Sequence, residues 1–321
     1  MTAFLDRAGW GGARAEPLAG DASSRRYTRL WRTGESAILM DDPDGDVALF
    51  ARLARHLRAL GLSAPDILAE APGQLLLEDL GDGLIARLAG DPAREMELYL
   101  CATDALVVLH RHAPPPGLTA ATPDLLARMT DLAFDHYAMG APDPARRDVA
   151  TAALHQALDH HAPDTDVMIL RDYHAENILW LPCRSGPARA GLLDFQDALA
   201  GHRAYDLVSL IEDARRDVAP AVAEACITHY LSRTGLPEAP FRAALAVLGA
   251  QRNLRILGVF ARLAASRGKP GYIDLIPRVW GHLQADLRHP ALAAVAEALQ
   301  GALPAPTPET LQRLKSPCPM P

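Results

Sequence analysis

Two short segments of the chain carry side chains whose types and spacing suit phosphoryl transfer. In the first, Asp172 stands five residues before Asn177 and follows the apolar run 167–170. In the second, Asp194 directly follows Leu192-Leu193. Phosphoryl transfer of the kinase type needs a carboxylate that accepts the hydroxyl proton, and an amide oxygen and a second carboxylate that hold Mg²⁺. Asp172, Asn177 and Asp194 could supply these groups in that order.

The alternative is that these residues only form turns, where Asp and Asn are common. The chain has only two Asn, Asn177 and Asn253, so an Asp at the required offset is uncommon by chance. A second Asp after an apolar strand about 20 residues later makes the coincidence rarer still. The spacing therefore favours the chemical interpretation.

The elements that must position these loops begin with a small β-rich lobe over residues 1–80. Alternating or short apolar patterns predict strands over 13–18, 25–32, 36–40 and 74–77. Helical spacing predicts a helix over 47–60, with Asp44 or Asp46 as its cap and Gly61 as its end. Glu78–Gly83 is interpreted as a hinge.

The pattern over residues 81–303 predicts a larger, mostly helical lobe. We expect this lobe to carry catalysis and substrate binding. Short strands are expected over 167–170, 178–181 and 190–193. Helices are expected over 94–110, 124–139, 145–161, 205–213, 219–233, 240–266, 273–287 and 291–303. Residues 304–321 are expected to be a Pro-rich tail. The fold class is therefore α+β with two lobes.

Composition excludes several classes of protein. The net charge of −7, from 39 acidic and 32 basic residues, argues against nucleic acid or an anionic membrane as the main partner. Four widely spaced Cys suggest neither a zinc site nor a disulfide framework. No secretory signal or membrane-spanning run is apparent. We expect a cytoplasmic protein, and the sequence leaves its oligomeric state open.

The chain resembles the aminoglycoside phosphotransferase-like kinases, which implies a protein-kinase-like fold. The wider resemblance is carried by Asp172–Asn177, Leu193-Asp194-Phe195 and Tyr205-Asp206-Leu207. A narrower resemblance, to the anomeric N-acetylmuramate/N-acetylglucosamine kinases of bacterial cell-wall recycling, is carried by residues 20–27, 76–81 and 251–277. The resemblance implies ATP and Mg²⁺, with Asp172 as catalytic base, Asn177 and Asp194 as metal ligands, and Asp206 as a structural tie to the catalytic loop.

The chain departs from the kinase pattern at the phosphate site. Met40 stands where the third kinase strand carries a Lys, and the following helix has no acidic partner. We expect phosphate charge to be met by Mg²⁺, by backbone N–H groups of the turn 20–24 and by Arg25 or Arg26, with Ser23, Ser24 and Arg25 as nucleotide-binding residues. For the two arginines the alternative is a solvated edge strand. Glu78 and Leu80 are predicted to offer hinge backbone groups to adenine, the alternative being a plain interlobe turn.

The predicted substrate site is an amino-sugar site built from two groups of residues. His174, Glu176 and Asp197 lie in or near the catalytic loops, and their alternative roles are solvent exposure for the first two and helix capping for Asp197. A basic stripe at helical spacing adds Arg252, Asn253, Arg255 and Arg262. Guanidinium groups match the carboxylate of a lactyl-bearing sugar in a bidentate fork. The alternative for the stripe is a solvated helix face.

These features predict an ATP-dependent sugar kinase that acts on the anomeric hydroxyl of an N-acetylated amino sugar. One rival is a kinase for an aminoglycoside, choline or another small hydroxylated metabolite. A rival of another class is a nucleotide-binding pseudokinase scaffold, which Met40 favours and the intact Asp172, Asn177 and Asp194 oppose.

Overall fold

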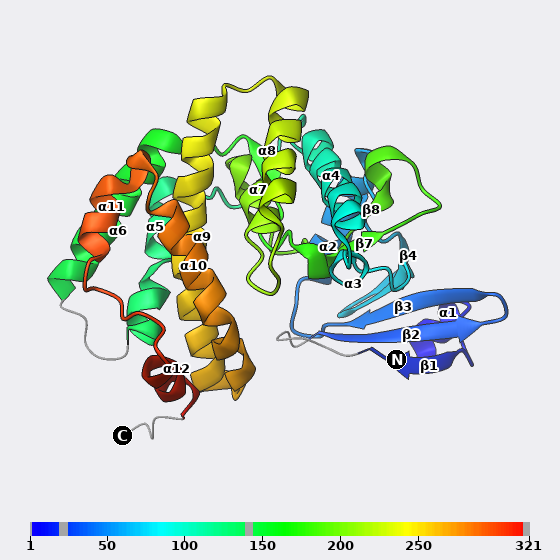
Figure 1. Ribbon diagram of the computed structural model, residues 1–321. Helices are drawn as coiled ribbons and strands as arrows, with labels where there is room; N and C mark the ends of the chain where they lie inside the picture. The colour runs from blue at the N-terminus through cyan, green and yellow to red at the C-terminus, as the bar shows by residue number, and fades with distance from the viewer. Residues whose placement is uncertain (1, 19–24, 139–143, 317–321) are drawn as a thin grey trace. The chain divides into compact units, whose positions relative to one another are not determined.

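The computed structural model describes residues 2–18, 25–138 and 144–316 (Figure 1). The chain divides into two compact units. The first combines Met1–Arg111 with Ala175–Ala198, and the second combines His112–His174 with Leu199–Pro321. The chain thus leaves the first unit once and returns to it before Asn177 and Asp194. The lobe boundary near residue 80 and the tail at 304–321 stay predictions.

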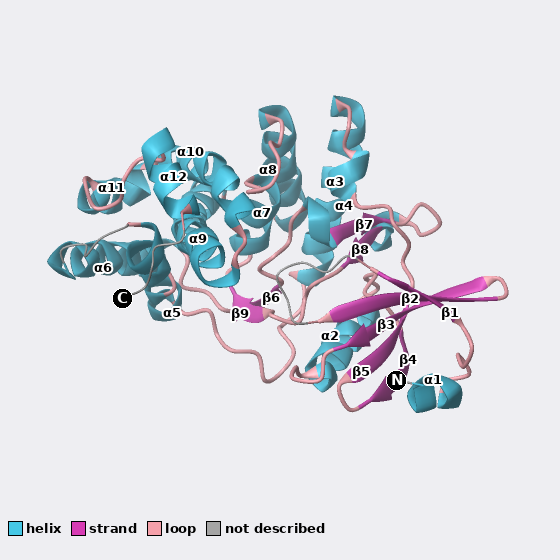
Figure 2. Ribbon diagram, turned by 90° about the horizontal axis from the view of Figure 1, so that it is seen from below, coloured by secondary structure: helices cyan, strands magenta, loops and turns pink. Residues whose placement is uncertain are grey.

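The first unit contains a five-stranded antiparallel sheet (Figure 2). Its strands follow the order β1-β2-β3-β5-β4 and have the bounds β1 Arg14–Pro17, β2 Arg26–Arg32, β3 Glu35–Asp41, β4 Ile67–Ala71 and β5 Gln74–Glu78. Four of them confirm the predicted strands. We did not predict β4, a five-residue strand at the edge of the sheet whose register with β5 is interrupted between Ile67 and Ala69.

One face of this sheet builds an apolar core from the alternation that the sequence shows. Buried residues from three strands meet two residues from the N-terminal segment: Leu30, Ala37, Leu39, Leu76, Phe4 and Trp10. Phe4 belongs to the short helix α1, Thr2–Arg7. Alternate side chains of a strand point to opposite faces, so the period of two places these residues together. The core of the sheet therefore holds β2, which Arg25 directly precedes.

Helix α2, Val47–Ala59, packs against β4 and β5. Its buried side follows the predicted spacing, with Phe50, Leu53 and Leu57 turned inward. The Asp46 carboxylate accepts a hydrogen bond of 2.8 Å from the Leu49 N–H. Of the two predicted caps, Asp46 is thus the one used, because only its side chain satisfies an otherwise unpaired N–H of the first turn.

The rest of the first unit holds the segment that carries Asn177 and Asp194. It contains helices α3, Ile85–Leu88, and α4, Pro92–Leu109, and the strands β7, Ile178–Trp180, and β8, Ala190–Leu192. The two strands pair antiparallel, with Ile178 opposite Leu192 and Trp180 opposite Ala190. The start of β7 therefore lies beside the end of β8.

The second unit is mostly helical, with one two-stranded sheet of β6, Val167–Ile169, and β9, Leu199–Gly201. Its helices are α5 Pro123–Arg128, α6 Pro144–His161, α7 Ala204–Ile211, α8 Pro220–Thr234, α9 Glu238–Arg267, α10 Ile276–Asp286, α11 Ala293–Leu299 and α12 Pro308–Lys315. Strand β9 was not predicted. Helix α12 lies within the expected tail and packs against α9.

Helix α9 is the centre of this unit and contacts α6, α7 and α10 (Figure 1). The helix expected over 124–139 is wrong in part: α5 ends at Arg128, and a π-helix follows over Ala133–Tyr137. The packing of α9 against this segment explains the difference. A Cβ at Gly258 would lie only 2.1 Å from the backbone carbonyl carbon of Leu132. The two backbones thus pack in direct contact, which the local sequence pattern could not reveal.

No helix in the described parts of the chain, including the 30-residue α9, is both long and apolar enough to cross a membrane.

Candidate active site

The loop that carries Asp172 is held from behind by Asp206. One Asp206 carboxylate oxygen accepts the Leu170 N–H at 2.6 Å, and the other accepts the Arg171 N–H at 2.8 Å. Asp206 lies on α7 and is fully buried, and this burial raises the pKa of its carboxyl to about 7. The contacts tie α7 to the loop that carries Asp172, as expected for Asp206.

The backbone immediately before Asp172 is strained. Arg171 has φ of 71°, a left-handed conformation that only one other described non-Gly residue, Asp194 at 56°, shares. Such conformations cost on the order of 1–3 kcal/mol and persist only where the surroundings fix them. Here Asp206 holds the Arg171 N–H and the Ser209 hydroxyl donates to the Arg171 carbonyl at 3.1 Å. Both strained residues thus lie at or beside positions that the sequence marked for chemistry.

One guanidinium of the second unit, that of Arg255, interacts with Asp172. Burial lowers the pKa of Arg255, Tyr205 and Asp172 oppose this shift, and the charges of Arg171 and Arg252 add to it. Arg255 therefore lies within electrostatic reach of Asp172.

His174 lies within electrostatic reach of Asp172 and is buried, so the alternative of solvent exposure is wrong for it. It is 6% exposed, and its Nε2 lies 3.1 Å from Nη1 of Arg215. Burial, and then the Arg215 charge, lower the pKa of His174 to about 4. The imidazole is consequently neutral at pH 7, so Nε2 accepts the hydrogen bond from Arg215.

Asn177 and Asp194 meet at one end of the β7–β8 pair in the first unit. Asn177 precedes β7, Asp194 follows β8, and the Leu193 N–H donates to the Asn177 carbonyl at 3.0 Å. The Gln196 amide donates to Asp194 at 2.8 Å and to Asp197 at 3.1 Å. The antiparallel pairing thus brings the two predicted metal ligands to the same edge.

The donor set at this edge fits Mg²⁺. Amide and carboxylate oxygens are its preferred protein ligands, and Mg²⁺ usually takes only one or two carboxylates together with substrate phosphates. No group of three or more His, Cys, Asp or Glu that could hold a metal occurs among the described residues.

Arg25 lies next to the same carboxylate. Its Nε donates to Asp42 at 3.0 Å and its Nη1 to Asp194 at 3.3 Å. The Arg25 side chain is 15% exposed, which excludes the alternative of a solvated edge strand. Met40 is 1% exposed in β3, opposite Tyr27 and Leu75. The cation beside Asp194 is thus supplied by the segment before β2 and not by the third strand.

The other predicted nucleotide-binding residues lie at different places. Ser23 and Ser24 lie outside the described residues. Glu78 ends β5, where its carboxylate is paired with Arg58 at 3.2 Å and Arg184 at 2.5 Å. Leu80 is half-buried two residues later. The Glu78 side chain is therefore committed to ion pairs, which leaves only backbone groups of this segment for a nucleotide base.

The basic stripe on α9 is not one uniform face. Arg252 is 5% exposed, Arg255 is half-buried and Arg262 is exposed. Asn253 is fully buried and donates from its amide to Glu212 at 2.8 Å and to Asp286 at 3.0 Å. The alternative of a solvated helix face is therefore wrong for Arg252 and Asn253. Of the loop residues, Glu176 and Asp197 are exposed.

Sequence reasoning missed several polar residues behind the loop, namely Ser209, Glu212, Arg215 and Asp286. Each contacts residues that are distant in the chain, and no local motif marks such contacts. One signal was present, because Ser209 is the lone serine in the helix Ala204–Ile211 and is flanked by the apolar residues Val208 and Leu210. A buried hydroxyl usually has a hydrogen-bond partner, which would have suggested a structural role.

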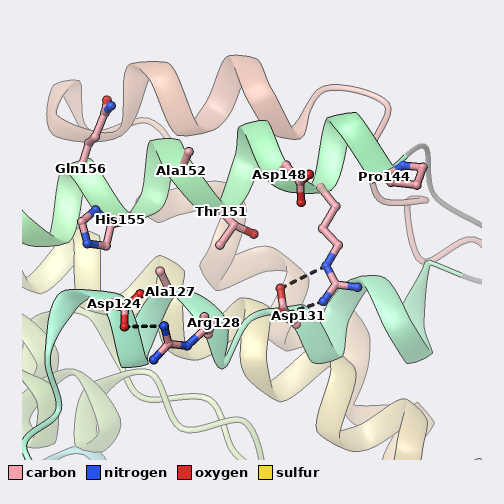
Figure 3. Close-up of a pocket in the computed structure, with 11 residues that line it drawn as sticks. Asp124, Ala127, Arg128, Asp131, Pro144, Asp148, Thr151, Ala152, His155 and Gln156 are labelled. Carbon is pink, nitrogen blue, oxygen red and sulfur yellow. Dashed lines mark hydrogen bonds and ion pairs between the residues drawn. The ribbon is translucent and has the colours of Figure 1, made fainter.

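A separate groove lies between α5 and α6, with a volume of about 670 Å³ (Figure 3). None of the predicted site residues lines it. Both of its arginines are ion-paired within the groove, Arg128 with Asp124 and Arg147 with Asp131. The groove is therefore no part of the candidate active site.

Comparison with known proteins gives consistent matches. The family model described as the phosphotransferase enzyme family matches residues 14–245. The chain is 41% identical to an N-acetylmuramate/N-acetylglucosamine kinase from Caulobacter vibrioides, over 91% of this chain and 92% of that protein. It is 31% identical to a kinase of the same name from Pseudomonas aeruginosa, over 91% and 90%.

A solved structure supports the fold. The protein from Ralstonia eutropha that was solved as a candidate aminoglycoside phosphotransferase matches with a TM-score of 0.68 and 17% identity, over 93% of this chain and 97% of that one. At this identity the similarity speaks for the fold alone, and it confirms the predicted two-lobed α+β class.

Proposed function

Because the chain belongs to the phosphotransferase enzyme family, we propose that it transfers the γ-phosphoryl group of ATP to the anomeric hydroxyl of N-acetylmuramate or N-acetylglucosamine. The observation that carries the sugar assignment is the 41% identity to the Caulobacter kinase over nearly its whole length. The strained, doubly anchored loop at Asp172 supports a catalytic role for that residue. A cytoplasmic location belongs to the same proposal, since ATP is the phosphoryl donor.

In this proposal Asp172 accepts the proton of the sugar hydroxyl as its oxygen attacks the γ-phosphorus in line. General-base catalysis of this kind typically contributes about 10²–10⁴-fold. The loop contacts to Asp206 and Ser209 fix the direction of the base before substrate arrives.

Asn177 and Asp194 would hold Mg²⁺, which when bound spreads the negative charge on the transferring phosphoryl group. Arg25 contributes a positive charge beside Asp194 that does not depend on a lysine in β3. Its fork of N–H donors suits phosphate oxygens. Arg25 could therefore exchange its contact with Asp194 for one with the nucleotide phosphates.

Selectivity for a carboxylate-bearing sugar is assigned to Arg255, with Arg262 as a more exposed contributor. Arg255 is half-buried and lies within electrostatic reach of Asp172. A partly desolvated guanidinium binds a carboxylate more strongly than an exposed one, because water competes less. His174, Glu176 and Asp197 remain proposed sugar-site residues, with His174 as a neutral hydrogen-bonding group.

The test is a panel of acceptors with ATP and Mg²⁺: N-acetylmuramate, N-acetylglucosamine, choline and an aminoglycoside. ADP release is measured with and without each acceptor, and products are identified by phosphorus NMR. We expect an anomeric phosphate from one or both amino sugars, and almost no product from the Asp172→Asn variant. A 6-phosphate would refute the anomeric assignment. Nucleotide binding without phosphorylated product would favour the pseudokinase scaffold.

A further inference from the structure

We propose that Arg252 and Ser209 are positioning residues for Asp172, with Arg252 acting on the loop through the Ser209 hydroxyl. Arg252 Nη2 donates to Ser209 Oγ at 2.7 Å. Ser209 Oγ in turn donates to the carbonyl oxygen of Arg171 at 3.1 Å. The two contacts form a relay from the middle of α9, through α7, to the residue before Asp172. The inference rests on the proposed phosphoryl transfer only for its kinetic test.

The relay has a fixed direction. A serine hydroxyl has one proton to donate and two lone pairs that accept. A guanidinium can only donate, so the Arg252 contact occupies a lone pair of Ser209 and leaves the hydroxyl proton for the Arg171 carbonyl. Ser209 is fully buried and Arg252 is 5% exposed, so water does not replace either contact. Without Arg252 the hydroxyl would be free to rotate away.

The end point of the relay is the strained residue. Arg171 is held in its left-handed conformation at both ends, by Asp206 at its N–H and by Ser209 at its carbonyl. The Arg171 carbonyl belongs to the same peptide plane as the Asp172 N–H. Releasing the carbonyl therefore permits this plane to turn, and the turn would redirect the Asp172 side chain. A base must lie within hydrogen-bond reach of the proton it takes, so a small change in direction lowers the rate.

Arg252 is itself held in place from two sides. Its guanidinium carbon lies 5.8 Å from the centre of the Tyr205 ring. The next residue, Asn253, anchors α9 to Glu212 and Asp286 through its amide. These contacts make Arg252 a rigid donor. They also explain why the inner end of the basic stripe is better assigned to the loop than to the sugar.

The experiment compares Ser209→Ala, Arg252→Met, Arg252→Lys and the double variant Ser209→Ala/Arg252→Met with the wild type. Arg267→Met is the matched control, because Arg267 is an exposed arginine on the same helix. Turnover and KM are measured with ATP and the amino sugars. Amide hydrogen exchange is measured at residues 170–172, without any substrate, because it reports the loop directly.

We expect Ser209→Ala and Arg252→Met each to lower kcat about 10-fold or more while both KM values change less than about twofold, because the loop and not binding is affected. Exchange at Arg171 and Asp172 should rise about 10-fold, as loss of one net hydrogen bond predicts. The double variant should be no worse than the more affected single, because both act on one contact. Arg252→Lys should recover part of the loss, and Arg267→Met should match the wild type.

A kcat loss in the double variant equal to the product of the two single losses would overturn the relay. Unchanged amide hydrogen exchange in both Ser209→Ala and Arg252→Met would also overturn it. A rise in KM with unchanged kcat would overturn it too, in favour of a direct sugar contact by Arg252. If the wild type phosphorylates no sugar, the proposed function fails, and the exchange data alone still decide whether the relay holds the loop. Loss of protection throughout the second unit would mean general destabilisation and would also count against the relay.

Discussion

The guanidinium of Arg25 lies 3.3 Å from the carboxylate of Asp194, a residue 169 positions later in the chain. Protein kinases place a lysine on the third strand to meet phosphate, and here the matching position is the buried Met40. Arg25 also donates to Asp42 at 3.0 Å, so its side chain has a second anchor besides Asp194. The first unit thus has a cation at the predicted metal edge that comes from a different element.

Arg25→Met should therefore raise KM for MgATP about 10-fold, the size of one charge-assisted hydrogen bond. Met40→Ala should have a much smaller effect on the same KM, since a thioether carries no charge. Steady-state kinetics with varied MgATP measure both, with Arg32→Met at the exposed end of β2 as control. An unchanged KM in Arg25→Met, or a larger loss in Met40→Ala, would contradict this account of the phosphate site.

Asp172→Asn should reduce turnover about 100- to 10,000-fold with little change in fold or in ATP affinity. The amide keeps the shape of the side chain and loses the proton acceptor. Turnover, circular dichroism and ATP titration of the purified variant provide the check. Wild-type-like turnover would remove Asp172 from the mechanism.

Asn177→Ala and Asp194→Ala should each weaken the benefit that Mg²⁺ gives to ATP binding. Each variant removes one oxygen ligand from a hard cation that prefers octahedral oxygen coordination. ATP is titrated with and without Mg²⁺ by calorimetry, and Glu176→Ala, an exposed neighbour in the loop, distinguishes ligand loss from general loss of negative charge. The metal assignment fails if both Ala variants keep the full Mg²⁺ effect.

Arg255→Gln should lower kcat/KM for N-acetylmuramate about 10- to 100-fold relative to N-acetylglucosamine. Only the first sugar carries the lactyl carboxylate that a half-buried guanidinium would bind. Arg262→Gln should change the ratio less, because Arg262 is exposed. The control is Arg267→Gln on the same helix. A ratio that both Arg255→Gln and Arg262→Gln leave unchanged would move selectivity to the loops near His174 and Asp197.

Asp286→Asn should make the stability of the protein less dependent on pH. Burial, and then the neighbouring Glu212 charge, raise the pKa of the Asp286 carboxyl far above its ordinary value. The folded protein therefore keeps a proton that the unfolded chain releases above about pH 4. The stability that this retained proton contributes is fully present below that pH. It is lost as pH rises, by at most about 1.4 kcal/mol per pH unit.

An amide at position 286 stays neutral and still accepts from Asn253, so the free energy of unfolding of Asp286→Asn should fall less between pH 5 and 8. Urea denaturation at three pH values measures this slope. The exposed Asp148→Asn variant should keep the wild-type slope. A slope that Asp286→Asn leaves intact would show that Asp286 is ionised in the folded protein.

Local patterns in the sequence were enough to predict most elements and the residues that mark the chemistry. The period of two predicted the strands that build the sheet, and the helical spacing with Asp46 as cap predicted α2, because these preferences act between residues close in the chain. The spacing of Asp172, Asn177 and Asp194 needed no tertiary information. The resemblance to a kinase family, carried by the same motifs, implied the fold that the structural comparison confirms.

The tertiary structure alone decided how these residues are supported. The pairings of Arg25 with Asp194, of Arg171 with Asp206 and of Arg252 with Ser209 join residues 35 or more positions apart. The sequence could not distinguish a buried arginine from an exposed one on the same helix, because helical spacing gives the face and not what covers it. Burial by α7 and α10 turns Arg252 and Asn253 inward and leaves Arg262 in solvent. Such packing is a property of segments brought together by folding, and no local pattern encodes it.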